Sequence, residues 1–86
     1  MTTLAVRKMT KPVVATGVRF AGSMMYVLLS DKREVGVPLP RFAWLAQASP
    51  EQRARWSIEP GGYAVWWDDL DDGIEVCHLL DMQSLA

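Results

Sequence analysis

Residues 13–20, VVATGVRF, are rich in β-branched and aromatic side chains, which favour an extended strand. Successive side chains of a strand point to opposite faces of its sheet. One face then carries Val14, Thr16, Val18 and Phe20, and the other carries Ala15, Gly17 and Arg19. The pattern predicts a strand with one solvated face.

Residues 24–30, MMYVLLS, are apolar at both alternating sets of positions. This pattern predicts a central strand that is covered on both faces or lies at a homodimer interface. Residues 34–39, EVGVPL, predict a third strand, and Pro38 marks its end or a sheet edge because proline has no N–H to donate. Short polar turns at 21–23 and 31–33 join the three strands into an antiparallel meander.

The hydrophobic spacing then changes to that of a helix. Phe42, Leu45 and Ala46 predict a short helix that ends near Ala48. A second short helix is expected from Ser49, which can cap it, with Pro50 at the first helical position and Gln52 completing a capping box.

The last third of the chain predicts short strands again. Residues 56–59 and 63–67 flank a Pro-Gly-Gly turn, residues 74–77 form a last short strand, and residues 78–85 form a tail or helical turn. The predicted fold is therefore α+β: a three-stranded antiparallel meander, one or two short helices, then two or three further short strands. Residues 1–12 are expected to be a flexible N-terminal arm, and residues 13–86 a single domain.

Charge is distributed unevenly along the 86 residues. All nine Lys and Arg lie between Arg7 and Arg55, whereas seven of the ten acids follow Trp56. If the fold keeps these halves apart, the molecule presents an acidic surface suited to a basic partner. The alternative is that the charges only solvate loops.

The single cysteine excludes an internal disulfide framework and fits a reducing compartment. The apolar run MMYVLL is far shorter than the ~20 residues that span a membrane. We therefore expect a cytoplasmic protein without a membrane partner.

The stretch WWDDLDDG, residues 66–73, brings four aspartates together and first suggests a metal site. An EF-hand loop with Gly73 at position 6 would place Leu70 at position 3 and Leu79 at position 12, where oxygen ligands are required. The sequence also contains neither GxxxxGK[ST] nor GxGxxG to hold a phosphate. We expect no metal and no cofactor, and interpret the stretch as a turn whose carboxylates bond local N–H groups.

Cys77 and His78 are the single cysteine and histidine of the chain. Adjacent residues on a strand point to opposite faces, so they cannot converge on a substrate or metal. We expect Cys77 to be a small core residue, His78 to lie on the surface, and the chain to be no enzyme.

The four tryptophans suggest a different kind of site. Trp66 and Trp67 must face opposite ways on a strand, so one can be exposed beside the aspartates, and tryptophan is favoured at interaction hot spots. The predicted partner-binding residues are Trp66, Asp68, Asp69, Asp71 and Asp72. The alternative is a nucleic-acid-binding or transcription-regulatory accessory domain, with contacts from Arg7, Lys8, Lys11, Arg53 and Arg55. Against it, the two helices are too short for a helix-turn-helix, and no RNP-type motif is present.

From Val37 onward the chain resembles a family of small bacterial domains of unknown function. The shared segments are VPL at 37–39, ASPEQR at 48–53 with Trp56, and Gly62 with Trp67, LDD at 70–72 and Ile74. The chain departs from the family pattern at Trp66, where histidine is common, at Asp68, where proline is usual, and at Gly73, where a second aspartate is usual. The resemblance implies a small α+β domain.

The same resemblance implies a role with a partner, because such genes often neighbour another small uncharacterised gene, and some relatives are fused to a helix-turn-helix. We therefore expect a non-enzymatic protein–protein interaction module, the antitoxin-like member of a bacterial two-gene pair. Its partner would be another small protein, encoded by the adjacent gene.

Overall fold

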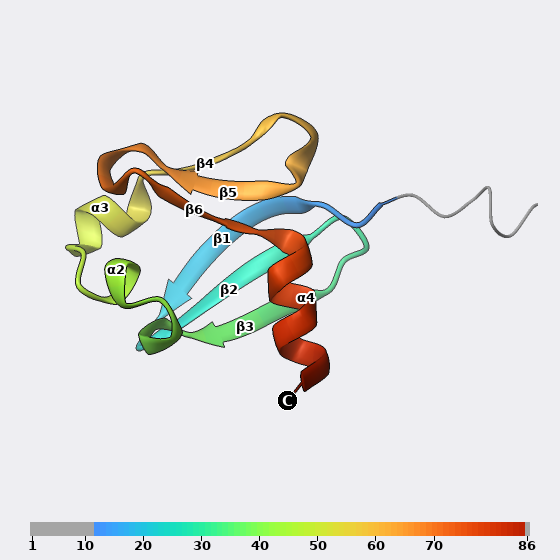
Figure 1. Cartoon of the computed structure of the whole chain (residues 1–86), viewed down its shortest axis with the longest axis horizontal. Helices are drawn as coiled ribbons and strands as arrows, with labels where there is room; N and C mark the ends of the chain where they lie inside the picture. Colours follow the sequence, from blue (N-terminus) through green and yellow to red (C-terminus); the bar gives the residue numbers. More distant parts are fainter. Residues whose placement is uncertain (1–11, 86) are drawn as a thin grey trace, which may run out of the picture.

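The structure is a computed structural model that describes residues 12–85, with side chains described to residue 81. Residues 1–11 of the predicted arm, with Arg7, Lys8 and Lys11, lie outside the described residues. Strands β1 (Ala15–Ala21), β2 (Met24–Leu29) and β3 (Glu34–Pro38) come first, followed by η1 (Leu39–Arg41), α2 (Ala43–Ala46) and α3 (Pro50–Ala54). The chain continues through β4 (Trp56–Ile58), η2 (Pro60–Gly62), β5 (Ala64–Trp67), η3 (Asp68–Leu70), β6 (Asp72–Glu75) and α4 (Val76–Leu85). The predicted α+β order of elements is confirmed (Figure 1).

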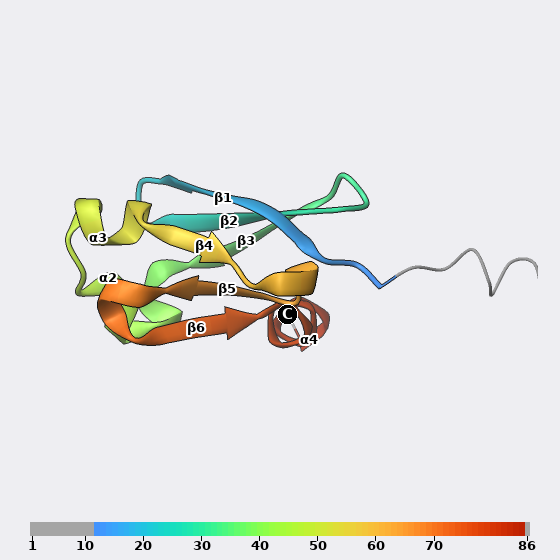
Figure 2. The ribbon, with the colours of Figure 1, turned by 90° about the horizontal axis from the view of Figure 1, so that it is seen from above.

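The strands form two three-stranded antiparallel sheets. We call β1-β2-β3 the N-terminal sheet and β4-β5-β6 the C-terminal sheet. β4 lies along β1, and α4 lies across β3, so the C-terminal sheet and α4 together cover one face of the N-terminal sheet (Figures 1 and 2). No helix within residues 12–85 is both long and apolar enough to cross a membrane.

The hydrophobic core lies between these layers. The fully buried side chains Met25 and Val27 come from β2, Val65 and Trp67 come from β5, and Leu79 comes from α4. They alternate with more exposed neighbours on each strand, as the period of two requires. Each sheet therefore has an inner face in the core and an outer face toward solvent.

The predicted face of Ala15 is wrong. Ala15 pairs with Leu29 but Gly17 pairs with Leu28, so Thr16 is an extra residue in β1 and forms a β-bulge. The bulge reverses the alternation, so Ala15 is only 3% exposed and shares the inner face with Val18. The Thr16 hydroxyl donates a hydrogen bond to the Leu28 carbonyl at 3.3 Å.

The prediction that β2 is the central strand is confirmed. Within the described residues its outer face is not covered, and the alternative of a homodimer interface stays a prediction. Leu28 is 36% exposed on the outer face, and Tyr26 beside it is partly exposed. The guanidinium carbon of Arg19 lies 4.2 Å from the centroid of the Tyr26 ring. Arg19 also donates two hydrogen bonds to the Glu34 carboxylate, at 2.7 and 2.9 Å. The hydrogen bonds between Arg19 and Glu34 hold the pKa of Glu34 below its ordinary value and that of Arg19 above it.

The predicted capping box of α3 is confirmed. The Gln52 N–H donates to the Ser49 hydroxyl at 3.1 Å, and the Ser49 N–H donates to the Gln52 side chain at 2.9 Å. In the last turn of this helix, the Arg53 carbonyl accepts a hydrogen bond from Trp67 Nε1 at 3.0 Å. Trp67 also meets Trp44 edge to face, with centroids 5.6 Å apart. These contacts fix α2 and α3 against the C-terminal sheet.

The expected strand at 74–77 is displaced: β6 covers Asp72–Glu75, and the chain turns into α4 at Val76. The segment 78–85, expected to be a tail or helical turn, is thus part of a ten-residue helix. Val76 and Leu79 are buried at helical spacing, which leaves Cys77 exposed on the other side of the helix. The expectation that Cys77 is a core residue is therefore wrong.

Candidate partner-binding surface

The acidic residues lie on a tight turn between β5 and β6. Asp68 opens the short helix η3, and the Asp71 N–H donates to its carbonyl at 3.2 Å. Asp71 adopts the left-handed conformation with φ of 51°, which aspartate tolerates better than most residues. Leu70 packs against the core between these exposed aspartates. The turn therefore holds its carboxylates on the surface while its leucine anchors it.

The four aspartates differ in what their carboxylates contact. Asp69 forms an ion pair with Arg55, and the Asp72 carboxylate accepts the N–H of Gly73 at 2.8 Å. Asp68 and Asp71 are exposed, and their carboxylates make no hydrogen bond or ion pair with any residue from 12 to 85. Asp69 and Asp72 thus help to hold the turn, whereas the carboxylates of Asp68 and Asp71 are exposed to solvent.

Trp66 lies next to this turn on the outer face of the C-terminal sheet. It pairs with Ser57 on β4 and with Gly73 on β6. The indole packs against Gly73 so closely that a methyl group there would overlap indole Cε3 and come within 2.7 Å of the Val65 carbonyl oxygen. Trp66 is partly exposed while Trp67 is fully buried, which confirms that the two tryptophans face opposite ways.

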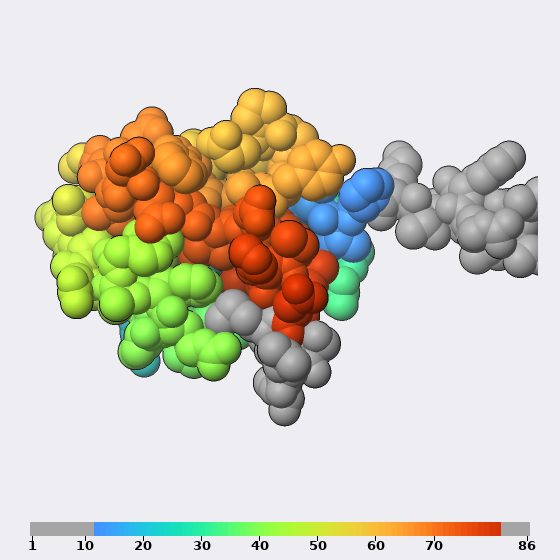
Figure 3. All heavy atoms as spheres, in the orientation of Figure 1, coloured from blue at the N-terminus to red at the C-terminus, as the bar shows by residue number. Residues whose placement is uncertain are grey.

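The structure does not gather the predicted nucleic-acid contacts into one cluster within residues 12–85. Arg53 is partly buried and donates from Nη1 to the Ala46 carbonyl at 3.2 Å. Arg55 pairs with Asp69, one of the predicted partner-binding residues. The basic and acidic halves of the sequence therefore meet at this ion pair, and α3 lies beside the acidic turn on the surface (Figure 3).

The titratable side chains at the start of α4 are exposed. The Cys77 thiol donates to the Glu75 carboxylate at 4.0 Å, and His78 Nδ1 lies 3.7 Å from the same carboxylate. Residues 12–85 contain no group of three or more His, Cys, Asp or Glu side chains that could hold a metal ion.

A comparison with protein families finds that DUF2442, described as a protein of unknown function, matches residues 15–82. The chain belongs to the DUF2442 family. The resemblance seen in the sequence is thereby confirmed at the level of the family. No curated protein matches the sequence.

Two solved structures resemble this DUF2442 chain. A protein of unknown function from Rhodospirillum rubrum is 24% identical, with a TM-score of 0.71 over 84% of this chain and 89% of that one. An uncharacterised protein from Chromobacterium violaceum is 20% identical, with a TM-score of 0.70 over 92% of this chain and 72% of that one. Both likenesses show that the fold is shared.

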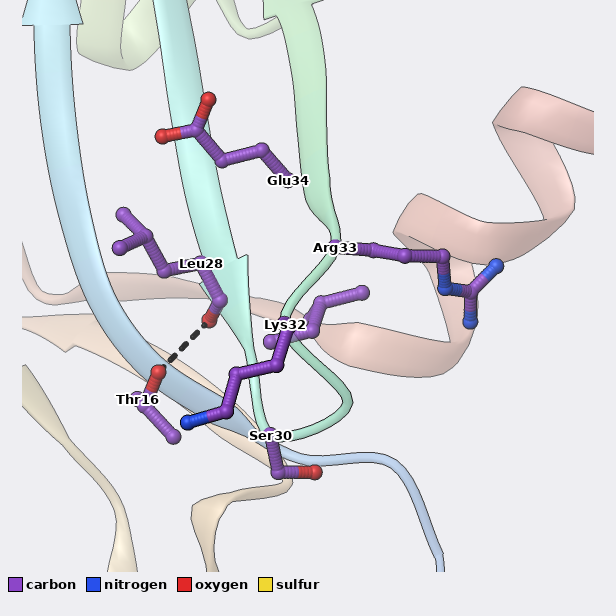
Figure 4. A pocket seen from close by; sticks show the side chains of 7 residues that line it. Thr16, Leu28, Ser30, Lys32, Arg33 and Glu34 are labelled. Atoms are coloured by element: carbon purple, nitrogen blue, oxygen red, sulfur yellow. Dashed lines mark hydrogen bonds between the residues drawn. The ribbon is translucent and has the colours of Figure 1, made fainter.

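The DUF2442 chain also has two surface hollows that the sequence did not indicate. One, of about 430 Å³, lies at the end of the N-terminal sheet, where the Lys32 side chain reaches toward Thr16 and Arg33 points away (Figure 4). The other, of about 470 Å³, is mostly apolar and lies between Val13, Tyr63 and Leu80. The second hollow is formed by segments far apart in the chain, so no local pattern could reveal it.

Proposed function

We propose that the chain is a non-enzymatic protein–protein interaction module that binds a basic protein partner. Its docking surface is Trp66 together with Asp68 and Asp71, which we call the acidic surface. The observation that carries the proposal is that two exposed carboxylates without partners in residues 12–85 lie on the turn that begins two residues after a partly exposed indole.

The acidic surface has the two components that a charged interface uses. Exposed carboxylates speed the encounter with a positively charged partner and disfavour acidic competitors. A tryptophan that is already packed on one side loses little conformational freedom on binding, and such residues supply much of the affinity at hot spots. The ion pair of Asp69 with Arg55 holds the turn in place.

We further propose that the partner is the small protein encoded by the adjacent gene, with this chain as the antitoxin-like member of the pair. This part rests on the association of genes implied by the resemblance to the family, and on the charge of the acidic surface. It predicts that the adjacent product is basic on the surface that binds.

Co-expression of the two proteins, purification on a tag carried by one of them, and calorimetric titration test the proposal. The variant Asp68→Asn/Asp71→Asn removes the two free charges without removing a hydrogen bond or ion pair within residues 12–85. The control Asp31→Asn/Glu34→Gln removes the same charge from the turn after β2 and from the start of β3. We expect binding to weaken in the first variant and not in the control. Unchanged binding after Asp→Asn substitution at all four aspartates of the turn would exclude the acidic surface.

A further inference from the structure

The outer faces of the two sheets share one arrangement of three residues across three strands. In the N-terminal sheet, Tyr26 on the central strand pairs with Arg19 on one side and with Gly36 on the other. In the C-terminal sheet, Trp66 on the central strand pairs with Ser57 on one side and with Gly73 on the other. In both rows an aromatic side chain lies between a polar residue and a glycine.

Both aromatic rings pack against the glycine of their row. A methyl group on Gly36 would come within 2.8 Å of the Tyr26 ring, and one on Gly73 would overlap the Trp66 ring. Glycine therefore allows each ring to lie flat against the backbone of the neighbouring strand. The opposite face of each ring is then available for contact with another side chain.

In the N-terminal sheet the chain itself supplies that cover. The guanidinium carbon of Arg19 lies 4.2 Å from the Tyr26 centroid, within the range of a cation–π contact. The same guanidinium is held by both carboxylate oxygens of Glu34, which stands two residues before Gly36. The Arg19 guanidinium thus makes a cation–π contact with Tyr26 and an ion pair with Glu34 at the same time.

In the C-terminal sheet the position of Arg19 is taken by Ser57, whose side chain carries no charge and is too short to cover an indole. Within residues 12–85, no Lys or Arg lies over Trp66. Asp71 stands two residues before Gly73, as Glu34 stands two residues before Gly36, and its carboxylate is exposed. The row therefore has the aromatic face and an acid close in sequence, but it lacks the cation.

We propose that Trp66 receives an arginine side chain of the partner protein, in the place that Arg19 occupies over Tyr26. The inference rests on the proposed function and specifies the side chain that the acidic surface recognises. Arginine is favoured over lysine because its planar guanidinium stacks on an aromatic ring while donating two hydrogen bonds to a carboxylate.

The test uses the full chain and three acetylated, amidated pentapeptides of sequence Gly-X-Gly-X-Gly, in which X is arginine, lysine or the neutral isostere citrulline. Binding is followed by NMR through the four indole N–H resonances, with that of Trp66 assigned from the Trp66→Leu variant. We expect the arginine peptide to shift the Trp66 resonance and the citrulline peptide to leave it unchanged. The lysine peptide is expected to bind about three- to fivefold more weakly than the arginine peptide.

Three variants separate the proposed contact from general charge attraction. Trp66→Leu keeps apolar bulk but removes the π face, and is expected to weaken binding of the arginine peptide about threefold or more. Because this variant lacks the Trp66 indole, its binding is followed through the backbone amide resonances of residues 68–72. Tyr26→Leu is the matched control, because that ring already carries Arg19, and it is expected to bind as the unmodified chain does. Ser57→Arg places a guanidinium from within the chain beside Trp66 and is expected to weaken peptide binding, whereas Ser57→Gln is not. Circular dichroism checks that each variant is folded.

Equal binding of the arginine and lysine peptides, or unchanged binding in both Trp66→Leu and Ser57→Arg, would overturn this inference. The proposed function would survive that result if the adjacent-gene product still lost affinity in Asp68→Asn/Asp71→Asn. Conversely, the chain could bind the arginine peptide selectively while the adjacent-gene product binds Asp68→Asn/Asp71→Asn as tightly as the unmodified chain. That result would support the arginine contact and contradict the proposed partner.

Discussion

The indole of Trp66 lies against Gly73 on the neighbouring strand, in a space that no other residue type leaves open. Gly73→Ala would drive a methyl group into the ring and to within 2.7 Å of the Val65 carbonyl oxygen. Because the backbone oxygen cannot move aside, we expect a loss of about 1–3 kcal/mol of unfolding free energy, measured by urea denaturation.

Gly17→Ala is the matched control for that substitution. Gly17 also lies in a strand on an outer face, but the nearest atom to an added methyl group is Leu28 Cδ1 at 3.9 Å, an ordinary contact. Its unfolding free energy is expected to change by about 0.5 kcal/mol or less. Equal losses in the two variants would contradict the packing of Trp66 on Gly73.

The hydrogen bond from Trp67 to the Arg53 carbonyl supports a second prediction. Trp67 is fully buried, and Trp67→Phe removes the Nε1–H donor while leaving the carbonyl without its partner. We expect a destabilisation of about 2 kcal/mol or more, which lowers Tm by about 10 °C in a domain of this size. Trp66→Phe, on the partly exposed outer face, is expected to lower the unfolding free energy by about 1 kcal/mol or less. Equal Tm values for Trp66→Phe and Trp67→Phe in thermal melts would contradict the assignment of the two tryptophans to opposite faces.

The ion pair between Arg19 and Glu34 predicts a pH dependence. Hydrogen bonds from the Arg19 guanidinium hold the pKa of Glu34 below its ordinary value in the folded state. The pair therefore contributes to stability above the unfolded-state pKa of about 4.3, and this contribution is lost as pH falls through the lower folded-state pKa.

Glu34→Gln isolates that contribution. We expect its Tm to lie below that of the unmodified chain near neutral pH, and the two values to converge in acid once the pH lies below the lowered folded-state pKa, where the glutamate is protonated in both states. Thermal melts at a series of pH values measure the difference. A difference that stays constant down to acid pH would show that the carboxylate charge is not its source.

The capping box of α3 predicts coupling between its two side chains. Ser49→Ala removes the acceptor of the Gln52 N–H and is expected to cost about 1 kcal/mol. Gln52→Ala removes the reciprocal bond to the Ser49 N–H. Because the two bonds share one helix end, the double variant is expected to lose less than the sum of the single losses. Strict additivity in denaturant titrations would contradict the reciprocal cap.

Local patterns in the sequence were sufficient for much of the fold. The apolar residues at both alternating sets of positions in 24–30 identified the central strand. Pro38 marked the end of the third strand, and Ser49 with Gln52 marked the start of α3. Each of these signals depends on residues close in the chain, where propensity and hydrogen-bonding capacity act directly.

The misassigned positions depend on longer-range structure. The inward position of Ala15 follows from a bulge whose register is set by pairing with Leu28 and Leu29. Cys77 is exposed because burial of Val76 and Leu79 against the two sheets favours a helix over a continued strand. Neither outcome is encoded in the adjacent residues alone.

The candidate site was predicted in part for the same reason. The sequence indicated Trp66 and the four aspartates, but it could not distinguish Asp69, held by Arg55, from the free carboxylate of Asp68. It also could not place Ser57 and Gly73 on either side of the indole, since that row exists only once three strands pair.

Calorimetric titration of the adjacent-gene product into the unmodified chain and into Asp68→Asn/Asp71→Asn tests the proposed function most directly. Two exposed charge contacts contribute about 1.4 kcal/mol together, so we expect the dissociation constant to rise about tenfold in the variant. It should stay unchanged in the control Asp31→Asn/Glu34→Gln. Absence of binding to the unmodified chain, or an equal loss in both double variants, would contradict an acidic docking surface at this turn.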